Sequence, residues 1–193
     1  MNLKMLPITA YGHPTLKVKG EEIRADYPDL DKFIAEMFET MYEADGIGLA
    51  AQQVNRAIRL FIIDAAPLAE DHPGLIDFKR VFINARIINE EGDEWDFEEG
   101  CLSVPGIREY VRRKPVVYLN YYDENWNYHE NERFDGVIAR IIQHEYDHTD
   151  GVVFIERLPH FKRVLLKNRL RDITTGKADV HYRMILPRLK RKR

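Results

Sequence analysis

The string HEYDH at residues 144–148 constrains the fold of this chain more than any other feature of its sequence. It ends a stretch, residues 135–149, in which apolar residues recur with the spacing of an amphipathic α-helix. Residues four apart in a helix lie one turn apart on the same face, so His144 and His148 can reach one metal ion. Glu145 projects to the side of that face, where it can address a water molecule without binding the metal itself. Two core or surface histidines on an ordinary helix are the alternative.

A catalytic metal site needs three protein ligands and an open position, so a third ligand must lie elsewhere in the sequence. The long form of the HExxH motif places a third histidine downstream, but Phe154 stands at that position. A downstream glutamate is the other familiar solution, yet Glu156 lies only eight residues past His148. We therefore look upstream, where Cys101 is the natural candidate because a divalent cation binds a thiolate. A lone cysteine is also common as a small buried hydrophobic residue.

Hydrophobic periodicity along the rest of the chain predicts an α+β fold. Residues 29–43 and 159–174 have helical spacing, and the second of these segments is rich in basic residues. Runs of β-branched and aromatic residues, separated by turn residues, predict short strands that pair largely antiparallel. These runs are residues 57–63, 81–88, 107–111, 115–122 and 126–134. We expect short antiparallel β-sheets packed around a central H-E-x-x-H helix, with an N-terminal helix and a C-terminal basic helix.

Length and cysteine content bound the domain organisation. A chain of 193 residues suits one domain with its own core, and no repeat or linker marks a second. We expect a single domain over residues 1–175, followed by a basic C-terminal extension over residues 176–193. A single cysteine excludes a disulfide framework and favours a reducing compartment. No apolar run approaches the ~18 residues of a membrane span, so we expect a cytoplasmic protein without a membrane partner.

Charge is distributed unevenly along the chain. Residues 157–193 hold 13 Lys and Arg against 2 Asp and Glu, whereas residues 1–156 hold 16 against 30. A basic terminal segment is a pointer to a polyanionic partner, and it is equally typical of a solvated end that supports a helix. The acidic cluster over residues 90–99 predicts a solvated surface segment, in which the Glu99 side chain points into the protein.

Three separated strings resemble the three signature motifs of the peptide deformylase family. They are GIGLAAQQ at residues 46–53, EGCLS at residues 99–103 and QHEYDH at residues 143–148, in that order. The resemblance runs from about Ala10 to about Asp172 and so covers most of the chain. Two positions depart from the family pattern without replacing a residue that has a chemical role. They are Gln52, beside the glutamine of the first motif, and Thr149, after the second histidine.

The resemblance implies an activity and a set of catalytic residues. Members of this family remove the formyl group from the N-terminal methionine of newly made polypeptides and release formate. By analogy, hydroxide supplied by the metal attacks the formyl carbon, and Glu145 acts as general base and then general acid. Gln53, through its side-chain NH2, and Leu102, through its backbone N–H, stabilise the oxyanion. Cys101, His144 and His148 are the metal ligands in this interpretation.

The same helix face can also form part of a pocket for the methionine side chain. Val137 and Ile141 lie seven and three residues before His144. Ile47 can close this pocket, and the neighbouring Gly48 suits a loop where the backbone must approach an extended peptide closely. The alternative is that the three apolar residues belong only to the core.

Two imidazoles and a thiolate suit several divalent metals, including zinc, nickel, cobalt and iron. The resemblance favours one Fe(II) ion per chain, with zinc, nickel or cobalt as substitutes. A ferrous thiolate site is sensitive to oxygen, since both the metal and the Cys101 sulfur can be oxidised.

Two other functions compete with deformylation at this point. HExxH alone suggests a zinc endopeptidase, although the missing downstream ligand argues against it. A zinc-stapled, ribosome-associated binding module needs the three ligands but has no use for Gln53 or Glu145. The partners that we expect are N-formylmethionyl nascent peptides and the ribosome near its exit tunnel. Phosphates of ribosomal RNA would attract the four basic residues Lys190, Arg191, Lys192 and Arg193.

Overall fold

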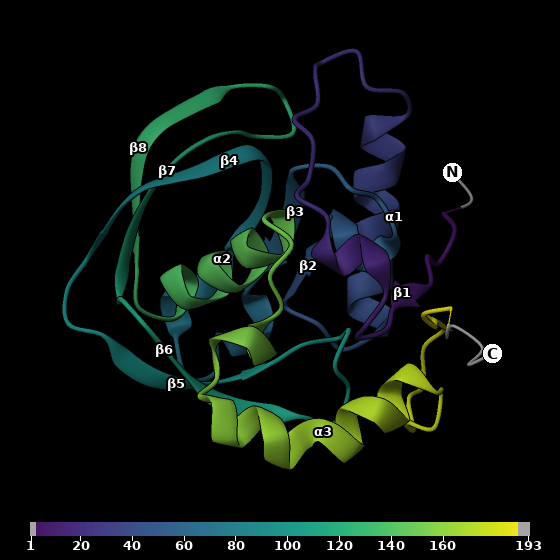
Figure 1. Cartoon of the computed structure of the whole chain (residues 1–193). Coiled ribbons are helices and arrows are strands. Elements are labelled where there is room, and N and C mark those ends of the chain that lie inside the picture. Colours follow the sequence, from purple (N-terminus) through teal and green to yellow (C-terminus); the bar gives the residue numbers. More distant parts are fainter. Residues whose placement is uncertain (1–2, 189–193) are drawn as a thin grey trace.

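A five-stranded antiparallel sheet curves around one central helix, α2 (Figure 1). The computed structural model describes residues 3–188. The strand order of the sheet is β2-β3-β4-β7-β8. Its strands are β2 (Gly48–Ala50), β3 (Leu60–Asp64), β4 (Lys79–Glu91), β7 (Val116–Tyr122) and β8 (Tyr128–Asp135).

Helix α2 (Gly136–Thr149) lies in the hollow of this sheet and is buried along most of its length. Apolar and aromatic side chains from the inner face of the sheet pack against it, as expected where alternate residues of a strand face a core. The rings of Phe61 and Phe82 stack with centroids 4.7 Å apart, and Tyr121 lies 4.6 Å from Phe82. The central position predicted for the H-E-x-x-H helix is therefore confirmed.

A second sheet contains only two antiparallel strands, β5 (Trp95–Gly100) and β6 (Arg108–Arg113). Strand β5 lies within the acidic cluster that the sequence suggested was a solvated surface. Its side chains alternate, because Asp96 and Glu98 are exposed whereas Glu99 is buried. The strand leads directly into Cys101, so the second sheet places the upstream ligand candidate beside α2.

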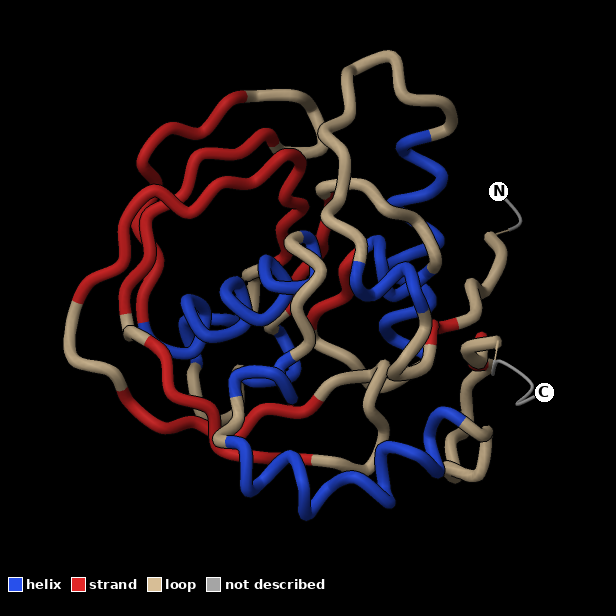
Figure 2. The backbone as a smooth tube through the Cα atoms, in the orientation of Figure 1, coloured by secondary structure: helices blue, strands red, loops and turns tan. Residues whose placement is uncertain are grey.

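The two remaining helices cover the outside of the molecule (Figure 2). Helix α1 (Leu30–Glu43) buries one apolar face against the first strands of the large sheet. Helix α3 (His160–Thr174) packs through Leu166, Leu170 and Ile173. None of the described helices is long and apolar enough to cross a membrane.

The two ends of the described chain meet in a third sheet. Strand β1 (Ile8–Thr9) pairs with strand β9 (Met184–Ile185), and the pairing is parallel rather than antiparallel. Figure 1 shows the yellow segment after α3 returning to the purple segment that begins the chain. The α+β fold expected from the sequence is confirmed, with this pairing as the exception. Residues 190–193, on which the docking hypothesis rests, lie outside the described residues.

Candidate active site

Cys101, His144 and His148 come together at the end of the two-stranded sheet. One potential ligand atom from each residue lies within 4.8 Å of the others. The Cys101 Sγ atom lies 3.3 Å from His148 Nε2. In a tetrahedral site with bonds of about 2.3 Å to sulfur and about 2.0 Å to nitrogen, these two atoms would lie about 3.5 Å apart. The donor set and its spacing therefore fit one divalent metal ion.

A neighbouring carboxylate orients His144, and the surroundings of His148 favour its neutral form. His144 Nδ1 lies 2.9 Å from Glu99 Oε2, which leaves Nε2 free to face the ligand centre. A carboxylate behind a metal-binding imidazole fixes the tautomer and the ring orientation. Burial and the nearby charges of His144 and Arg113 hold the pKa of His148 well below its ordinary value. The neutral imidazole of His148 is the form that binds a metal.

Glu145 is buried against the backbone of Gly48. A Cβ atom added to Gly48 would lie 2.5 Å from Glu145 Oε1, so only glycine leaves room for this carboxylate. Within residues 3–188, Glu145 Oε2 has no hydrogen-bond partner. Burial raises the pKa of the Glu145 carboxyl to about 7. A carboxyl group with such a pKa can both accept and donate a proton near neutral pH.

Gln53 is held in a fixed orientation beside Cys101. It lies in a short 3-10 helix, Ala51–Val54, that follows β2 directly. Its side-chain Oε1 accepts a hydrogen bond of 2.8 Å from the Ala50 N–H. The amide NH2 therefore points the other way, with Nε2 3.4 Å from both Cys101 Sγ and Ser103 Oγ. Its donors therefore face Cys101 and Ser103.

The loop that follows β5 contains, next to Cys101, a backbone N–H without a partner among residues 3–188. Leu102 comes immediately after Cys101, and its side chain packs against Gly46, where an added Cβ would lie 2.8 Å from Leu102 Cδ1. No acceptor among the described residues pairs with the Leu102 N–H. A free N–H next to a metal ligand can stabilise a developing negative charge on oxygen.

The residues expected to hold a methionine side chain belong to one apolar cluster. Ile141 is buried, and Ile47 and Val137 are half-buried and pack against the same group. A cavity of about 710 Å³ lies at the N-terminal end of α2 and includes Val137 and Trp95 in its lining. The three ligand candidates do not line this cavity, and Ile47 and Ile141 do not line it either.

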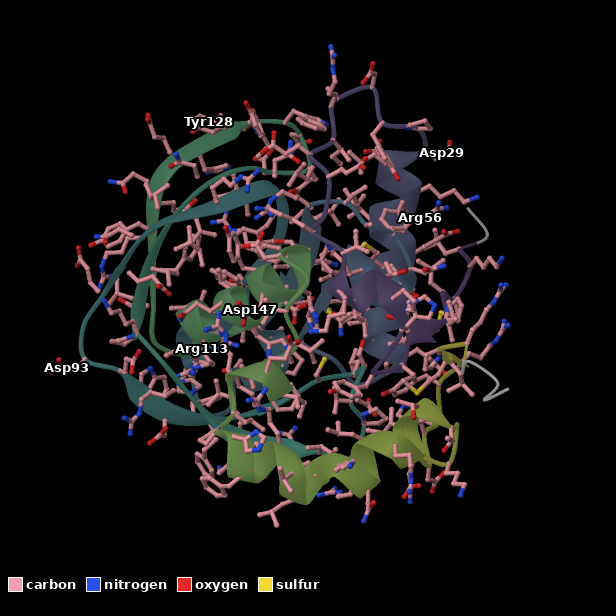
Figure 3. All side chains as sticks on the ribbon, viewed as in Figure 1. Asp29, Arg56, Asp93, Arg113, Tyr128 and Asp147 are labelled. Carbon is pink, nitrogen blue, oxygen red and sulfur yellow. The ribbon has the colours of Figure 1, made fainter. Side chains whose placement is uncertain are left out.

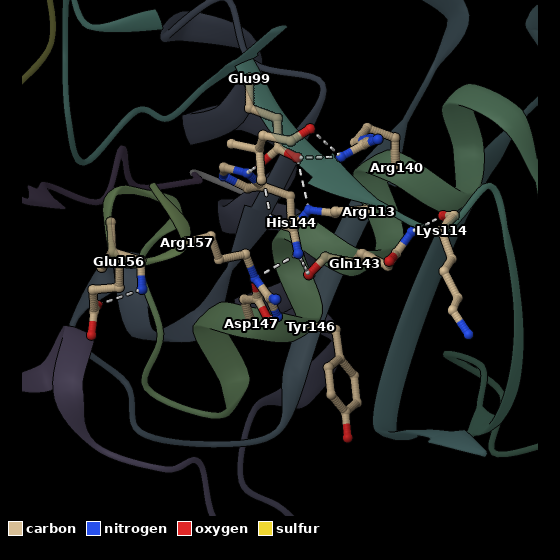
Figure 4. Close-up of polar contacts among 12 residues, drawn as sticks. Glu99, Arg113, Lys114, Arg140, Gln143, His144, Tyr146, Asp147, Glu156 and Arg157 are labelled. Carbon is tan, nitrogen blue, oxygen red and sulfur yellow. Dashed lines mark hydrogen bonds and ion pairs between the residues drawn. The ribbon is translucent and has the colours of Figure 1, made fainter. Parts of the chain in front are cut away.

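A buried network of charges lies behind the metal centre (Figure 4). Arg113 donates to Glu99 over 2.7 and 3.0 Å and to Asp147 over 2.7 Å. Arg140 donates to Glu99 over 3.1 Å, and Arg157 pairs with Asp147. Burial alone would raise the pKa of Glu99, but hydrogen bonds from His144 and Arg113 hold it well below its ordinary value. Glu99 thus stays ionised and can hold the His144 ring in place.

The basic members of this network could not be predicted from the sequence. Figure 3 shows Asp147, which belongs to α2, and Arg113 in the interior of the molecule, whereas Asp93 and Tyr128 lie at the periphery. Asp147 stands three residues after His144, which puts it near the ligand face of the helix and could have signalled a supporting role. Arg113 comes from β6, and no local pattern distinguishes it from the exposed Arg112 beside it.

Comparisons with known proteins agree with the motifs. The sequence profile of the family described as Polypeptide deformylase matches residues 5–164. The chain is 47% identical over 196 residues to the peptide deformylase of Christiangramia forsetii, which covers 98% of this chain and 100% of that protein. It is 50% identical over 194 residues to that of Flavobacterium psychrophilum, with 97% and 100% covered.

Solved structures show the same fold. A peptide deformylase from Plasmodium falciparum superimposes with a TM-score of 0.78 at 32% identity, covering 88% of this chain and 95% of that one. A peptide deformylase from Legionella pneumophila gives a TM-score of 0.78 at 30% identity, covering 90% and 98%.

Proposed function

Because this chain belongs to the polypeptide deformylase family and is therefore a deformylase of N-formylmethionyl nascent peptides, we propose how its own residues carry out the reaction. The observation that carries the proposal is the Cys101, His144 and His148 group with the Glu145 carboxylate buried beside it. Deformylation transfers the formyl group to water and leaves a free amino terminus, so it needs an activated water molecule, an oxyanion site and a proton carrier.

Cys101, His144 and His148 would hold one divalent metal ion. When bound, such an ion lowers the pKa of a water molecule and polarises the formyl oxygen. Fe(II) is the metal that we propose, and zinc, nickel or cobalt also match the donor set. The network behind His144 keeps its ring oriented, because Glu99 is itself fixed by two arginines.

Glu145 moves the protons of the reaction in this proposal. Its carboxylate accepts a proton from the attacking water and then gives it to the amine that leaves. Close packing against Gly48 fixes the carboxylate at one position, and its Oε2 atom is free of other partners within residues 3–188. These features support a role in catalysis rather than in the stability of the fold.

Gln53 and Leu102 form the oxyanion site. The hydrogen bond from the Ala50 N–H supports the role of Gln53, because it holds the side-chain amide with its NH2 group next to Cys101 before substrate binds. The Leu102 N–H would be the second donor. Donors that are fixed in advance stabilise the charge that develops on the formyl oxygen at little reorganisation cost. A small site of this kind admits the hydrogen of a formyl group and excludes the methyl group of an acetyl group.

The methionine side chain would lie on the apolar cluster next to the metal. Ile47, Val137 and Ile141 supply its walls, and Gly48, the first residue of β2, adjoins Ile47 where the peptide backbone would bind. In this arrangement the scissile bond lies between Glu145 and the oxyanion donors.

An assay of formate release tests the proposal. We expect protein reconstituted anaerobically with Fe(II) or Ni(II) to release formate from formyl-Met-Ala-Ser and no acetate from the acetylated peptide. Glu145→Gln should keep its metal but lose about 100-fold or more in kcat, since a general base contributes on that scale. Retention of both metal and activity by Glu145→Gln would overturn the proposed role. Cleavage of an internal bond in a blocked peptide would instead indicate an endopeptidase, and metal binding without turnover would indicate a stapled binding module.

We also propose that the enzyme works in the cytoplasm, near the ribosomal exit tunnel. Its substrates emerge at the ribosome, and the C-terminal part of the chain is strongly basic. Helix α3 leaves Phe161, Val164 and Leu165 exposed on its outer face, which adds an apolar contact surface to the basic one.

A further inference from the structure

The segment after α3 folds back onto the segment that contains β1 (Figure 1). We call residues 177–188 the return segment. It lies beyond residues 5–164, which match the family profile. Its backbone is anchored by β1, because the Ile8 N–H donates to Arg183 O over 2.8 Å and the Ala10 N–H donates to Ile185 O over 2.9 Å.

Two neighbouring side chains of the return segment contact two other parts of the chain, the loop after β5 and the end of α1. The Tyr182 hydroxyl donates a hydrogen bond of 2.7 Å to the Leu102 carbonyl oxygen. His181 Nε2 donates to Glu43 O over 2.8 Å and lies 3.5 Å from Asp45 Oδ2. Asp45 directly precedes Gly46, so the return segment contacts the second motif at Leu102 and the residues just before the first motif.

The loop that contains Leu102 depends on such contacts for its shape. Residues 101–104 follow β5 but belong to no strand, so no ladder of hydrogen bonds fixes their peptide groups. Three consecutive carbonyl groups in this loop each accept one hydrogen bond. Val104 N–H donates to Cys101 O over 2.8 Å, and Tyr11 N–H donates to Ser103 O over 2.8 Å. The bond to the middle carbonyl, that of Leu102, comes from Tyr182.

We propose that Tyr182 is a positioning residue of the active site, whose hydroxyl fixes the Leu102 carbonyl and so limits rotation about Leu102, the residue that carries the proposed oxyanion N–H. Peptide groups are planar, so the Leu102 N–H is held together with the Cys101 carbonyl, and the Leu102 carbonyl fixes the peptide group that follows. With the Cys101 carbonyl fixed on the other side, Leu102 has little freedom to rotate. The inference rests on the proposed function, because it assumes that the Leu102 N–H stabilises the oxyanion.

Removal of one hydroxyl group tests the inference in the full-length, metal-loaded enzyme. We expect Tyr182→Phe to lower kcat about tenfold, because a misdirected oxyanion donor costs less than the 100-fold or more that its loss would cost. KM should stay within about twofold, since the methionine pocket is untouched. The thermal midpoint and the bound metal should match those of the unchanged protein. A role in the fold alone would lower the thermal midpoint and leave kcat per folded molecule unchanged.

Tyr118→Phe is the matched control. The hydroxyl of Tyr118 also donates one hydrogen bond, of 3.2 Å, to Glu91, on the far part of the large sheet. We expect this variant to keep the kcat of the unchanged protein.

A kcat for Tyr182→Phe equal to that of Tyr118→Phe, or a loss of activity that follows only from unfolding or metal loss, would overturn the inference. Glu145→Gln is assayed alongside, because full activity in that variant would mean that the proposed mechanism has failed. If Glu145→Gln is inactive while Tyr182→Phe is fully active, only the role of Tyr182 is wrong.

Discussion

At the scale of single residues, the active site depends on close packing between side chains and backbone. Gly48 is the clearest case, because its missing side chain is the space that the Glu145 carboxylate occupies. The backbone of Gly48 has no unusual conformation, so the requirement for glycine comes from close approach alone.

Gly48→Ala should therefore abolish most of the activity without unfolding the protein. The added methyl group would displace Glu145 from its position, and we expect kcat/KM to fall about 100-fold, a loss typical of a misplaced catalytic group. Formate release, thermal unfolding and metal content are the measurements. Gly74→Ala is the control, since an added Cβ there meets nothing within 4 Å. Equal activity in the two variants would show that Glu145 can act from another position.

Prediction from sequence works at this scale where the chemistry is local. The His144 and His148 pair could be predicted because one turn of helix brings the two rings together. The group formed with Cys101 could be proposed because only one cysteine was available. The link from Tyr182 to Leu102 could not, since nothing in the sequence indicates which residue reaches a carbonyl 80 positions away.

At the scale of elements, the site lies between a helix and a short strand, and hairpins hold the surrounding sheet in shape. The turn between β7 and β8 is built around Asp123. Its carboxylate accepts hydrogen bonds from the backbone N–H groups of Asn125 and Asn127 and from the side chains of Asn127 and His129. Partial burial acts to raise the pKa of Asp123, but these hydrogen bonds outweigh it and lower the pKa to about 2.

This shift predicts how the stability of the hairpin depends on pH. A carboxyl group whose pKa is lower in the folded state stabilises the fold above its unfolded pKa, and the contribution is lost as pH falls through the folded pKa. Asp123→Asn keeps an acceptor but has no charge to titrate. We expect its thermal midpoint to lie below that of the unchanged protein at pH 7, and the gap to close between about pH 4 and pH 2. Glu124→Gln, at an exposed neighbouring position, should show no such change of gap.

The helices and strands predicted from the sequence agree with the structure where the hydrophobic periodicity is strong. They differ from it where a strand pairs with a segment that is distant in the sequence. The three helices lie within a few residues of the predicted ranges because their apolar faces repeat clearly. The prediction from sequence missed strand β5 because its acidic residues suggested a solvated surface. The alternation of residue types that is typical of a strand was nevertheless present in this segment of the sequence. Strand β9 has two residues and forms only because β1 lies beside it. The predicted division between residues 1–175 and 176–193 stays a prediction.

At the scale of the whole molecule, the acidic and the basic parts of the sequence occupy different regions of the structure. The acidic body carries the active site, and the basic α3 lies on the outside (Figure 1). Electrostatic attraction to ribosomal RNA would therefore act mainly through the C-terminal part of the molecule.

Neutralising the four terminal basic residues tests this arrangement. Replacing Lys190, Arg191, Lys192 and Arg193 by Gln should weaken co-sedimentation with ribosomes. The slope of log affinity against log salt should fall by about 3, since each phosphate contact contributes about 0.7 to 0.9. Deformylation of a free peptide serves as the control and should be unchanged. Co-sedimentation that is equally strong and equally salt-dependent would place any docking surface elsewhere.

The parallel pairing of β1 with β9 also sets the order in which the molecule can be completed during its own synthesis. A ribosome makes the two glycines of the first motif early, the cysteine loop next and the histidine helix after that, while Tyr182 and β9 emerge later than all of them. Contacts between residues so far apart in sequence form late in folding. Each new copy thus forms the contact between Tyr182 and Leu102 only after all three motifs have been made.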